Sequence, residues 1–585
     1  MGIDQEFEGI KTNIPGVYSK SEYPPSLGAI GAASNVVAII GEAKGGVPHN
    51  ASVDDAQKIN VITSLGQAVD LLVGGPGFYM TEFYLTPTKE ENLAKPSQCY
   101  FVRVNPATQA IATLVDASSD EIIKLSSTRY GVLANQISRK IEAGTNKGKK
   151  VTVKFKGSTL VAKDDIAQEY MELLYSGGGS PATVSINSVG LTTSCTGATT
   201  DDLSLAFADY PKLGDLVNYI HQQANYTCTL TGKEDAATAN FDAVADVDMT
   251  TTAALDANVQ ALIDFFNDES GGEIKAELVT GADRDPITND SNFVFLTGGS
   301  EGTTSNNHWA ATLELLEKFK INHILVASGD SAIHAMVDTH IIEQSSIENR
   351  NNRSAGAGAG SSTSTKAARI AEMKALNSPR LEYWCTPFYR YDIVNGNVKK
   401  EFEPFYLSAL GAGIRFGNHQ TTTATFRALN ILGIKEEYTR QDKKDYIAAG
   451  GSILERNERG ICVVHNVSTY QGSNLILNLP PALRTADYIT LDIQAKLTAM
   501  LNSLTKAPNS LVIKSIQNYI ITNLLPGYVN DGLLMSDPNT GAPAFSDVEF
   551  SLSGDRFDVS FTGIVAVPLH FIFIKQKFIV VGFNS

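Results

Sequence analysis

Residues 292–327 read NFVFLTGGSEGTTSNNHWAATLELLEKFKINHILVA, a stretch that contains a strand, a helix and a second strand in succession. The runs NFVFLTGG and HILVA have the short apolar character of buried strands. Between them, apolar residues recur at the three- and four-residue spacing of an amphipathic helix; they are Trp309, Leu313, Leu316 and Phe319. Strands that alternate with helices indicate a layered α/β unit.

The same alternation continues on both sides of this stretch. Downstream, Asp330 or Ser331 can cap a helix whose apolar positions are Ile333, Met336, Val337 and Ile341. Residues 366–376 predict a further helix, and an Asn395-Gly396 turn predicts a hairpin between residues 389–394 and 398–402. Upstream, residues 35–41 and 99–104 predict two buried strands.

The region between these upstream and downstream parts has a different amino-acid composition. Residues 112–289 contain short β-like pieces, Ser/Thr tracts and an acidic Ala/Thr stretch. We expect this region to be an inserted β-rich surface domain. Residues 26–111 and 290–440 would then form one discontinuous α/β core domain.

Two further segments complete the predicted organisation. Residues 1–25 contain three prolines and few apolar residues, which indicates an extended N-terminal arm. Residues 441–585 predict a C-terminal α+β domain with a strand at 460–464, a second helix at 509–525 and β-structure from 546 to 581. The long helix between them carries one apolar stripe, made by Ile489, Ile493, Leu497, Leu501 and Leu504.

Residues 349–365 read NRNNRSAGAGAGSSTST and are of low complexity. Small residues in such a run predict a mobile surface loop. Gly356, Gly358 and Gly360 alternate with alanine, and no strand is expected before them, so they indicate a flexible linker rather than a nucleotide-binding loop.

Composition and charge exclude several classes of protein. The 585 residues include 47 basic and 63 acidic side chains, for a net charge of −16. This charge repels phosphate backbones, so we expect no direct nucleic-acid partner. The acidic N-terminus does not resemble a signal peptide, and the apolar stretch 559–574 is too short and interrupted to cross a membrane, so we expect no membrane insertion.

No catalytic, cofactor-binding or metal-binding site is expected. Residues 298–302, GGSEG, lack the spacing of a phosphate-binding loop and predict a structural turn. His334, Asp338 and His340 share a helix but offer no third ligand on one face. A solvated acidic surface is expected for Asp242, Asp246 and Asp248. Buried thiols in a reducing compartment are expected for the five cysteines, which are Cys99, Cys195, Cys228, Cys385 and Cys462.

The apolar C-terminus is the most informative physical feature. A strand of this kind on a free sheet edge would offer unpaired amides and carbonyls to any other strand. It is therefore either buried centrally in its own domain or paired with a neighbouring copy of the chain. The proline-marked N-terminal arm has the extended character that such an exchange requires.

An ordered set of segments resembles the contractile tail sheath proteins of long-tailed phages and related injection machines. The set covers both ends and the middle of the chain. Its members are PGVY (15–18), VVAIIGEAKGG (36–46), FLTGGSEG (295–302), TTTATFRALN (421–430), GICVVHNVSTYQGS (460–473) and VPLHFIFIKQKFIVV (567–581). No match to the family can be assigned for residues 112–289, and the Gly/Ala/Ser loop at 354–365 is peculiar to this chain.

This resemblance implies a structural subunit rather than an enzyme. It would polymerise helically around a tail tube and contract from a metastable extended state to drive the tube through a cell envelope. The implied partners are other copies of the chain by strand exchange, the tail tube protein, and the baseplate and tail terminator proteins. The implied location is the virion tail, assembled in the host cytoplasm. No cofactor is implied.

The linking residues implied by the resemblance lie at the two ends of the chain. The N-terminal arm would link subunits through Ile14, Pro15, Gly16, Val17 and Tyr18. The C-terminal strand would do so through Phe571, Ile572, Phe573, Ile574, Phe578, Ile579 and Val580.

Two alternative functions come from other classes of protein. An α/β hydrolase or transferase would account for the alternating strands and helices, but it needs convergent titratable groups at strand ends. A surface-layer or adhesin-like assembly protein would account for the Ser/Thr-rich region, but it should carry an export signal.

Overall fold

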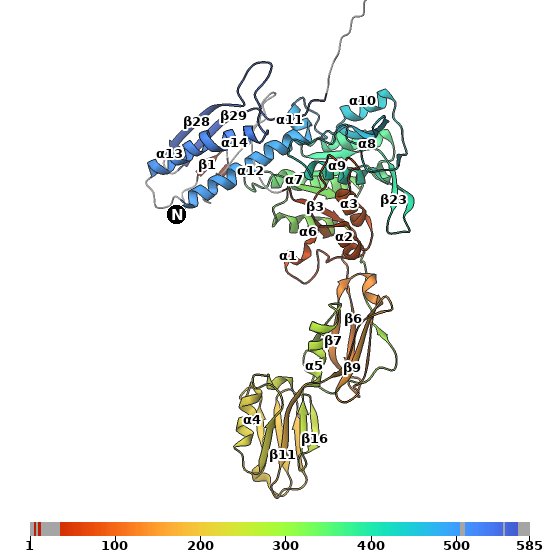
Figure 1. Cartoon of the computed structure of the whole chain (residues 1–585), viewed down its shortest axis with the longest axis vertical. Helices are drawn as coiled ribbons and strands as arrows, with labels where there is room; N and C mark the ends of the chain where they lie inside the picture. Colours follow the sequence, from red (N-terminus) through yellow and green to blue (C-terminus); the bar gives the residue numbers. More distant parts are fainter. Residues whose placement is uncertain (1–4, 8–9, 13–34, 504–508, 554–555, 571–585) are drawn as a thin grey trace, which may run out of the picture. The chain divides into compact units, whose positions relative to one another are not determined.

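The computed structural model describes residues 5–7, 10–12, 35–503, 509–553 and 556–570 (Figure 1). The chain forms two compact units. The first comprises the described residues up to Ala43, those from Val47 to Asn105 and those from Thr304 onward; the second comprises Lys44–Gly46 and Pro106–Thr303. A mixed α/β fold of several parts is confirmed, whereas the four-part division of the chain stays a prediction.

An eight-stranded sheet is the centre of the first unit. Its strand order is β27-β26-β22-β21-β20-β3-β5-β4. The six inner strands are parallel, and β4 and β27 pair antiparallel at the two edges. The bounds are β3 Val37–Gly41, β4 Asn60–Ile62, β5 Cys99–Arg103, β20 His323–Val326, β21 Ser354–Gly358, β22 Leu381–Trp384, β26 Gly451–Asn457 and β27 Gly460–His465.

Helices cover both faces of this sheet, because successive residues of a strand point to opposite faces. Ile324 and Val326 of β20 pack in one apolar cluster with α6 and α7, while Leu325 packs in another with α3 and α9. Parallel strands buried on both faces carry nearly continuous apolar runs, which is what the sequence shows. The helices are α1 Asp55–Lys58, α2 Leu65–Leu72, α3 Pro76–Leu85, α6 Asn306–Glu317, α7 Ser331–Gln344, α8 Lys366–Leu376, α9 Leu407–Phe416 and α10 Arg440–Ala448.

Several local predictions for this unit are confirmed. The carboxylate of Asp330 accepts a hydrogen bond from the main-chain N–H of Ala332 and caps α7. The helix predicted at 366–376 is α8. The Asn395-Gly396 turn joins β23 (Phe388–Asp392) to β24 (Val398–Phe402), and β25 (Gly433–Ile434) completes that small sheet.

The prediction of a mobile loop over residues 349–365 is wrong for its glycine-rich part. Residues 354–358 form β21, an inner strand of the large sheet, and the residues from Ala355 to Gly360 are buried. A Cβ atom on Gly358 would lie 2.7 Å from the Cα of Phe405. Neighbouring main chain approaches β21 too closely for larger side chains, so the small residues reflect packing rather than flexibility.

The strand predicted at NFVFLTGG is also placed differently. Val294 and Phe295 form β19, which pairs with β8 in the second unit and is not a strand of the large sheet. The α/β alternation of the first unit therefore resumes with α6 and not with a strand. A local apolar pattern identifies a strand but does not identify its partner.

The second unit is built mainly of β-strands around two separate apolar cores. The sheet orders are β10-β9-β8-β19, β18-β7-β6, β15-β11-β17 and β14-β13-β12-β16. The strands are β6 Gln109–Val115, β7 Glu121–Tyr130, β8 Ile137–Ala143, β9 Lys149–Phe155, β10 Ser158–Ile166, β11 Glu169–Tyr175, β12 Ala182–Ile186, β13 Gly190–Cys195, β14 Ser204–Ala206, β15 Tyr226–Leu230, β16 Val244–Asp248, β17 Ala253–Asp256 and β18 Ile274–Leu278. Its α-helices are α4 Leu213–His221 and α5 Asn258–Asp264.

The chain segments that lead into and out of this second unit lie side by side. Thr108 and Ser300 form an antiparallel bridge, and the N–H of Thr108 donates to the carbonyl of Ser300 at 2.9 Å. Ile111 and Thr297 form a second bridge of the same kind. The predicted structural role of residues 298–302 fits this pairing.

The C-terminal part of the first unit is helical and then β-structured. The helices are α11 Leu475–Asn478, α12 Pro480–Ser503, α13 Asn509–Tyr519 and α14 Leu525–Asn530, with one π-helical turn at Ile520–Leu524. The strands β28 (Phe545–Ser553) and β29 (Arg556–Gly563) follow. Near the N-terminus, β1 (Gln5–Phe7) and β2 (Ile10–Thr12) form a short antiparallel pair. None of the helices in the described ranges is long and apolar enough to span a membrane.

Candidate subunit-linking site

The strands β28 and β29 form a two-stranded antiparallel sheet close to the C-terminus (Figure 1). Phe550 lies opposite Val559, and Leu552 lies opposite Phe557. Within the described residues no third strand pairs with either of them. Both outer edges therefore carry main-chain N–H and C=O groups without a ladder partner in this part of the chain, and such edges can accept another strand.

One face of this small sheet is apolar and packs on the C-terminal helices. The side chains that face the helices occur at every second position, and they are Val548, Phe550, Phe557, Val559 and Phe561. The rings of Phe550 and Phe557 stack with their centroids 5.9 Å apart. The helices contribute Ile489 and Leu497 of α12 and Ile516 of α13 to the same cluster.

The opposite face of the sheet is polar. Glu549, Ser551 and Ser560 are exposed, and Arg556 pairs with Asp558 across this face at 2.8 Å. A sheet with one packed face, one hydrated face and two open edges has a fixed orientation but incomplete hydrogen bonding. A single two-stranded hairpin is marginally stable alone, so packing on the C-terminal helices stabilises this one, while its edges stay open to further strands.

The long helix α12 fixes this sheet to the large sheet of the first unit through buried ionic groups. The guanidinium of Arg484 donates to the carbonyl of Arg415, at the end of α9, at 2.6 Å. A cation at this position stabilises the negative end of a helix. Asp487, one turn further along α12, accepts two hydrogen bonds from Arg380 at 2.6 and 2.9 Å and one from Asn352.

Beneath α12, Arg415 donates to Glu382 of β22, and the amide of Asn466 donates to the same carboxylate at 2.8 Å. Burial raises the pKa of Glu382 and lowers the pKa of Arg415 and Arg484. The like charge of Arg415 also lowers the pKa of Arg484, whereas Glu382 and Arg415 stabilise each other's ionised form. The network therefore favours one position of α12 on the sheet.

Hydrogen bonds also define the path of the chain after β29. The N–H of Ile564 donates to the carbonyl of Ala544, and the N–H of Ala566 donates to the carbonyl of Leu533. Four residues later, a ring nitrogen of His570 lies 3.2 Å from a ring nitrogen of His465, the last residue of β27. The described chain ends at this contact.

The linking residues predicted from the sequence lie outside the described residues. This holds for the N-terminal set Ile14, Pro15, Gly16, Val17 and Tyr18 and for the C-terminal set Phe571, Ile572, Phe573, Ile574, Phe578, Ile579 and Val580. Leu504 of the predicted helical stripe also lies outside them, while Ile489, Ile493 and Leu497 occupy the expected apolar side of α12. The roles of these terminal residues stay predictions.

The sequence interpretation predicted β-structure from residue 546 onward but did not assign residues of β28 or β29 to the linking site. A usable signal existed, because FSDVEFSLS and RFDVSFTG alternate apolar and polar residues with the period of a half-buried strand. It also missed Arg380, Arg484 and Asp487. No local pattern indicates these three, since each pairs with a group distant in sequence.

The two histidines that were considered as metal ligands in the sequence, His334 and His340, contact other side chains. His334 contacts Glu372 at 2.7 Å, and His340 contacts the guanidinium of Arg353 at 2.8 Å. No group of three or more potential metal ligands occurs in the ranges that the structure describes. The five cysteines are buried and free, as predicted.

The expectation that Asp242 belongs to a solvated acidic surface is wrong. Its side chain is buried, and its carboxylate accepts hydrogen bonds from the main-chain N–H groups of Asn258 and Val259 at the start of α5. Burial raises the pKa of Asp242 to about 6, and these hydrogen bonds oppose the rise. Asp246 and Asp248 are exposed, as expected.

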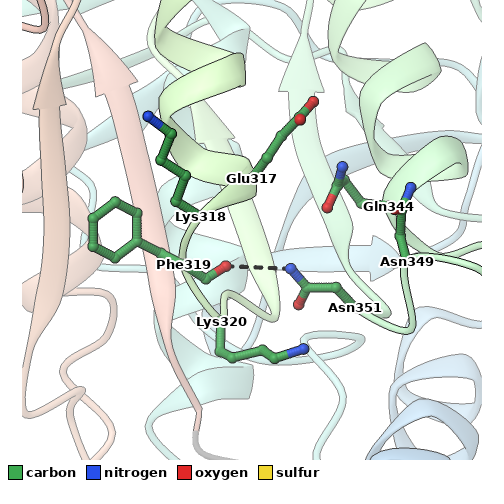
Figure 2. Close-up of a pocket in the computed structure, with 7 residues that line it drawn as sticks. All are labelled: Glu317, Lys318, Phe319, Lys320, Gln344, Asn349 and Asn351. Carbon is green, nitrogen blue, oxygen red and sulfur yellow. Dashed lines mark hydrogen bonds between the residues drawn. The ribbon is translucent and has the colours of Figure 1, made fainter. Parts of the chain in front are cut away.

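A polar cavity of about 310 Å³ lies where α6 and α7 end (Figure 2). Figure 2 shows the amide of Asn351 donating to the main-chain carbonyl of Phe319, at 3.2 Å. The other lining residues are Glu317, Lys318, Lys320, Gln344 and Asn349. The cavity is next to the amino ends of β20 and β21, whereas open parallel sheets bind ligands at the carboxyl ends. It therefore gives no support to a hydrolase-like site.

The chain is similar to one curated protein and to solved structures. A tail sheath protein of Bacillus phage SP01 is 22% identical over 605 residues, which span 99% of this chain and 98% of that protein. The crystal structure of a sheath tail protein from Listeria innocua matches with a TM-score of 0.53 at 12% identity, covering 92% of this chain and 93% of that one. The crystal structure of a sheath tail protein from Desulfitobacterium hafniense matches with a TM-score of 0.49 at 12% identity, covering 94% of this chain and 100% of that one.

No family model matches the chain. The resemblance to tail sheath proteins that the sequence predicts is confirmed by the relative from phage SP01, whose similarity runs through the whole chain. The Listeria structure supports the fold alone.

Proposed function

We propose that this chain is the subunit of a contractile tail sheath, which assembles into helical layers around a tail tube. The observation that carries the proposal is the small sheet β28-β29. Its apolar face is packed, both of its edges are unpaired within the described residues, and the apolar run that begins at Phe571 follows it in the sequence. The full-length similarity to a tail sheath protein supports the same conclusion.

In this proposal the open edges of β28 and β29 accept terminal strands from neighbouring copies. Each net main-chain hydrogen bond contributes about 0.5 to 1.5 kcal/mol, so a donated strand that makes about five of them holds two subunits by several kcal/mol. Residues 571–580 are the proposed C-terminal donor, and residues 14–18 belong to the proposed N-terminal arm. Main-chain pairing between subunits would persist while the subunits rotate relative to one another.

Contraction requires two packings of the same subunits, with the contracted one lower in free energy. A difference of a few kcal/mol per subunit is enough, because many copies add their contributions. The tail tube, baseplate and tail terminator proteins are the proposed partners. The proposed location is the virion tail, with assembly in the host cytoplasm.

A truncation tests the strand donation. We expect a chain that ends at His570 to be soluble and to unfold at the same urea concentration as the full chain, because its described core is intact. It should fail to form striated cylinders in negative-stain electron micrographs. Cylinders of normal length from this truncated chain would contradict the proposal.

Disulfide crosslinking identifies the edge that accepts the strand. Ser551→Cys on β28 or Ser560→Cys on β29 is combined with single cysteines placed in turn at positions 571–580. The native cysteines are buried, so background reaction is low. Assembled particles should give intermolecular dimers at alternate positions for at least one edge. Ser188→Cys, an exposed site of the second unit, is the matched control and should give none.

A further inference from the structure

The outer face of the sheet β10-β9-β8-β19 in the second unit is basic. Alternate residues of β8 and β9 pack in an apolar core, so the residues between them point outward. Three of these outward residues are Lys140, Lys150 and Lys154. The outward set of the two strands contains one carboxylate, Glu142, which pairs with Lys140 at 2.8 Å. No ion pair to Lys150 or Lys154 occurs among the described residues, so these two ammonium groups can pair with another molecule.

The same face also offers aromatic contact area. Phe295 of β19 lies opposite Ser138 of β8 and is 54% exposed. The ammonium of Lys154 lies 3.9 Å from the centre of the Phe293 ring. Small side chains lie among these groups, at Ser138, Thr152 and Ala162. We call this surface the basic face, and it comprises Lys140, Lys150, Lys154, Phe293 and Phe295.

The other part of the second unit has the opposite charge. Residues 169–257, which contain its other apolar core, include twelve Asp or Glu side chains and two Lys or Arg side chains. Residues 137–163, which contain β8 and β9, include one acidic and eight basic side chains. The acidic net charge of the chain is therefore concentrated away from the basic face.

The sheet β14-β13-β12-β16 in this acidic part has an outward face of hydroxyl groups with two carboxylates on its edge strand. Asp248 of β16 lies opposite Thr183, and the main-chain N–H of Asp246 donates to the hydroxyl of Ser185 at 3.0 Å. None of the four strands carries a basic residue. We call this surface the acidic face, and it comprises Thr183, Ser185, Thr192, Ser194, Asp246 and Asp248.

We propose that the basic face of one copy docks on the acidic face of the next copy in the assembled sheath. The inference rests on the proposed function and deepens it, because it adds a contact between subunits that is separate from the donated strands. A contact between two different faces of identical chains leaves one face free at each end, so further copies can add. Such a heterologous contact produces an open helix when its rotation does not close a ring, as a helical sheath requires.

Charge complementarity is the reason to place a second copy, rather than another molecule, on the basic face. Lysine ammonium groups donate hydrogen bonds, and the hydroxyl and carboxylate oxygens of the acidic face accept them. Every copy carries both faces in equal number, and a polymer holds neighbouring copies at a high effective concentration. Single exposed ion pairs contribute little to affinity. We therefore expect these charges to act mainly on the rate of association, as complementary surfaces do.

Charge-reversal variants of the full-length chain test the contact. Lys150→Glu with Lys154→Glu makes the basic face acidic. Asp246→Asn with Asp248→Lys and Ser194→Lys makes the acidic face basic; Asn suits position 246 because its φ is 52°. Light scattering follows assembly in about 50 mM NaCl, where screening is weak. We expect each variant alone to assemble at least about tenfold more slowly than the parent protein, because like charges then face each other.

Mixing the two variants identifies the occupant of the basic face. The reversed basic face of one variant matches the reversed acidic face of the other, and their two unreversed faces also match. An equal mixture should therefore assemble within about twofold of the rate of the parent protein. Recovery in the mixture also shows that both variants are folded, since a misfolded chain cannot offer a matching face. A mixture that stays as slow as the separate variants overturns docking on a second copy.

Two controls separate the faces from net charge. Lys212→Glu with Lys233→Glu makes the same change in net charge as the variant of the basic face, at exposed positions outside both faces. This control variant should assemble at the rate of the parent protein. In about 500 mM NaCl the rates of the parent protein and of the two face variants should converge, because screening removes both attraction and repulsion.

The docking contact and the proposed function can fail separately. If the parent protein forms cylinders and every variant assembles equally fast, the docking contact is overturned and the sheath function stands. If the charge reversals abolish association and mixing restores it, but no cylinders form, the contact is supported and the sheath function is contradicted. A parent protein that does not associate overturns both.

Discussion

Buried ionic side chains determine how the long helix α12 joins the large sheet. Arg415 and Glu382 are 1% and 2% exposed, and each is the charge partner of the other. Removing one member of such a pair leaves an uncompensated charge in the protein interior, which is more destabilising than replacing both members. The two tryptophans of the chain, Trp309 and Trp384, are both buried in this unit. Their fluorescence therefore reports its unfolding specifically.

We expect Arg415→Met to lower the free energy of unfolding of the first unit by about 3 to 5 kcal/mol. The double variant Arg415→Met with Glu382→Leu should recover a large part of this loss, since it removes the orphaned carboxylate. Urea unfolding followed by tryptophan fluorescence measures both. Equal losses in the single and double variants would contradict the assignment of the effect to charge.

Glu82 of α3 predicts a pH dependence of stability. Burial raises the pKa of Glu82 to about 7, and Arg390, whose guanidinium is 3.2 Å away, opposes the rise. Because the folded state holds this proton more tightly than the unfolded state does, its contribution to stability is present at acidic pH. That contribution declines as the pH rises from about 4.5 through 7.

We therefore expect Glu82→Gln to remove roughly 2 kcal/mol of the decrease in unfolding free energy between pH 5 and pH 8. Urea unfolding at the two pH values gives the difference. Glu458→Gln, at an exposed position in the turn before β27, is the control and should keep the pH dependence of the parent protein. An identical pH dependence in both variants would show that Glu82 titrates normally.

At the scale of secondary-structure elements, β21 shows how packing selects small residues. A Cβ atom on Gly358 would meet the main chain of Phe405 at 2.7 Å and the carbonyl of Trp384 at 2.7 Å. Main-chain atoms on two sides cannot move as a flexible side chain can. The strand therefore has room for glycine at this position and for little else.

We expect Gly358→Ala to lower the free energy of unfolding by about 1 to 3 kcal/mol through overpacking. Gly66→Ala is the matched control, because a Cβ atom at Gly66 in α2 meets nothing within 4 Å. That substitution should stabilise the protein by a few tenths to about 1 kcal/mol, since alanine is the better helix former. The two variants should therefore shift the urea midpoint in opposite directions.

The elements that the sequence predicts well are those whose signal is local. The helices α6, α7 and α8 follow from apolar spacing and, for α7, from the cap at Asp330. β21 could not be predicted in this way, because its glycines and alanines reflect contacts with residues near Phe405 that lie far away in the sequence. β19 was recognised as a strand, but its pairing with β8 is not encoded in its own residues.

The candidate site also combines features that have a local sequence signal with features that depend on distant residues. The sequence predicted β-structure beyond residue 546 and a long helix before it, and both are present. The open edges of β28-β29 depend on which strands are near, which no local pattern reveals. The contacts of Arg484 with the end of α9 and of His465 with His570 join residues about 70 and about 105 positions apart. Such pairs can be found only in the folded structure.

At the scale of the whole molecule, each unit has apolar cores of its own. The two clusters that line the large sheet contain no residue between 106 and 303. The two clusters of the second unit contain no residue outside that range. A region with its own core that leaves and returns through paired segments can fold as a separate domain.

We expect a chain in which an Asn-Gly turn replaces residues 109–299 to keep the urea midpoint of tryptophan fluorescence within experimental error. The turn would join Thr108 to Ser300, which already lie opposite each other as a two-residue hairpin requires. Residues 106–303 expressed alone should show cooperative unfolding by circular dichroism. An insoluble shortened chain or a much lower midpoint would contradict the independence of the two units.

The pairing of Thr108 with Ser300 also bears on how such proteins diversify. Two chain segments that run together at one point allow genetic recombination to exchange everything beyond that point without altering the residues before Thr108 or after Ser300. Lineages can then exchange the region between Thr108 and Ser300 while the first unit stays under constant selection.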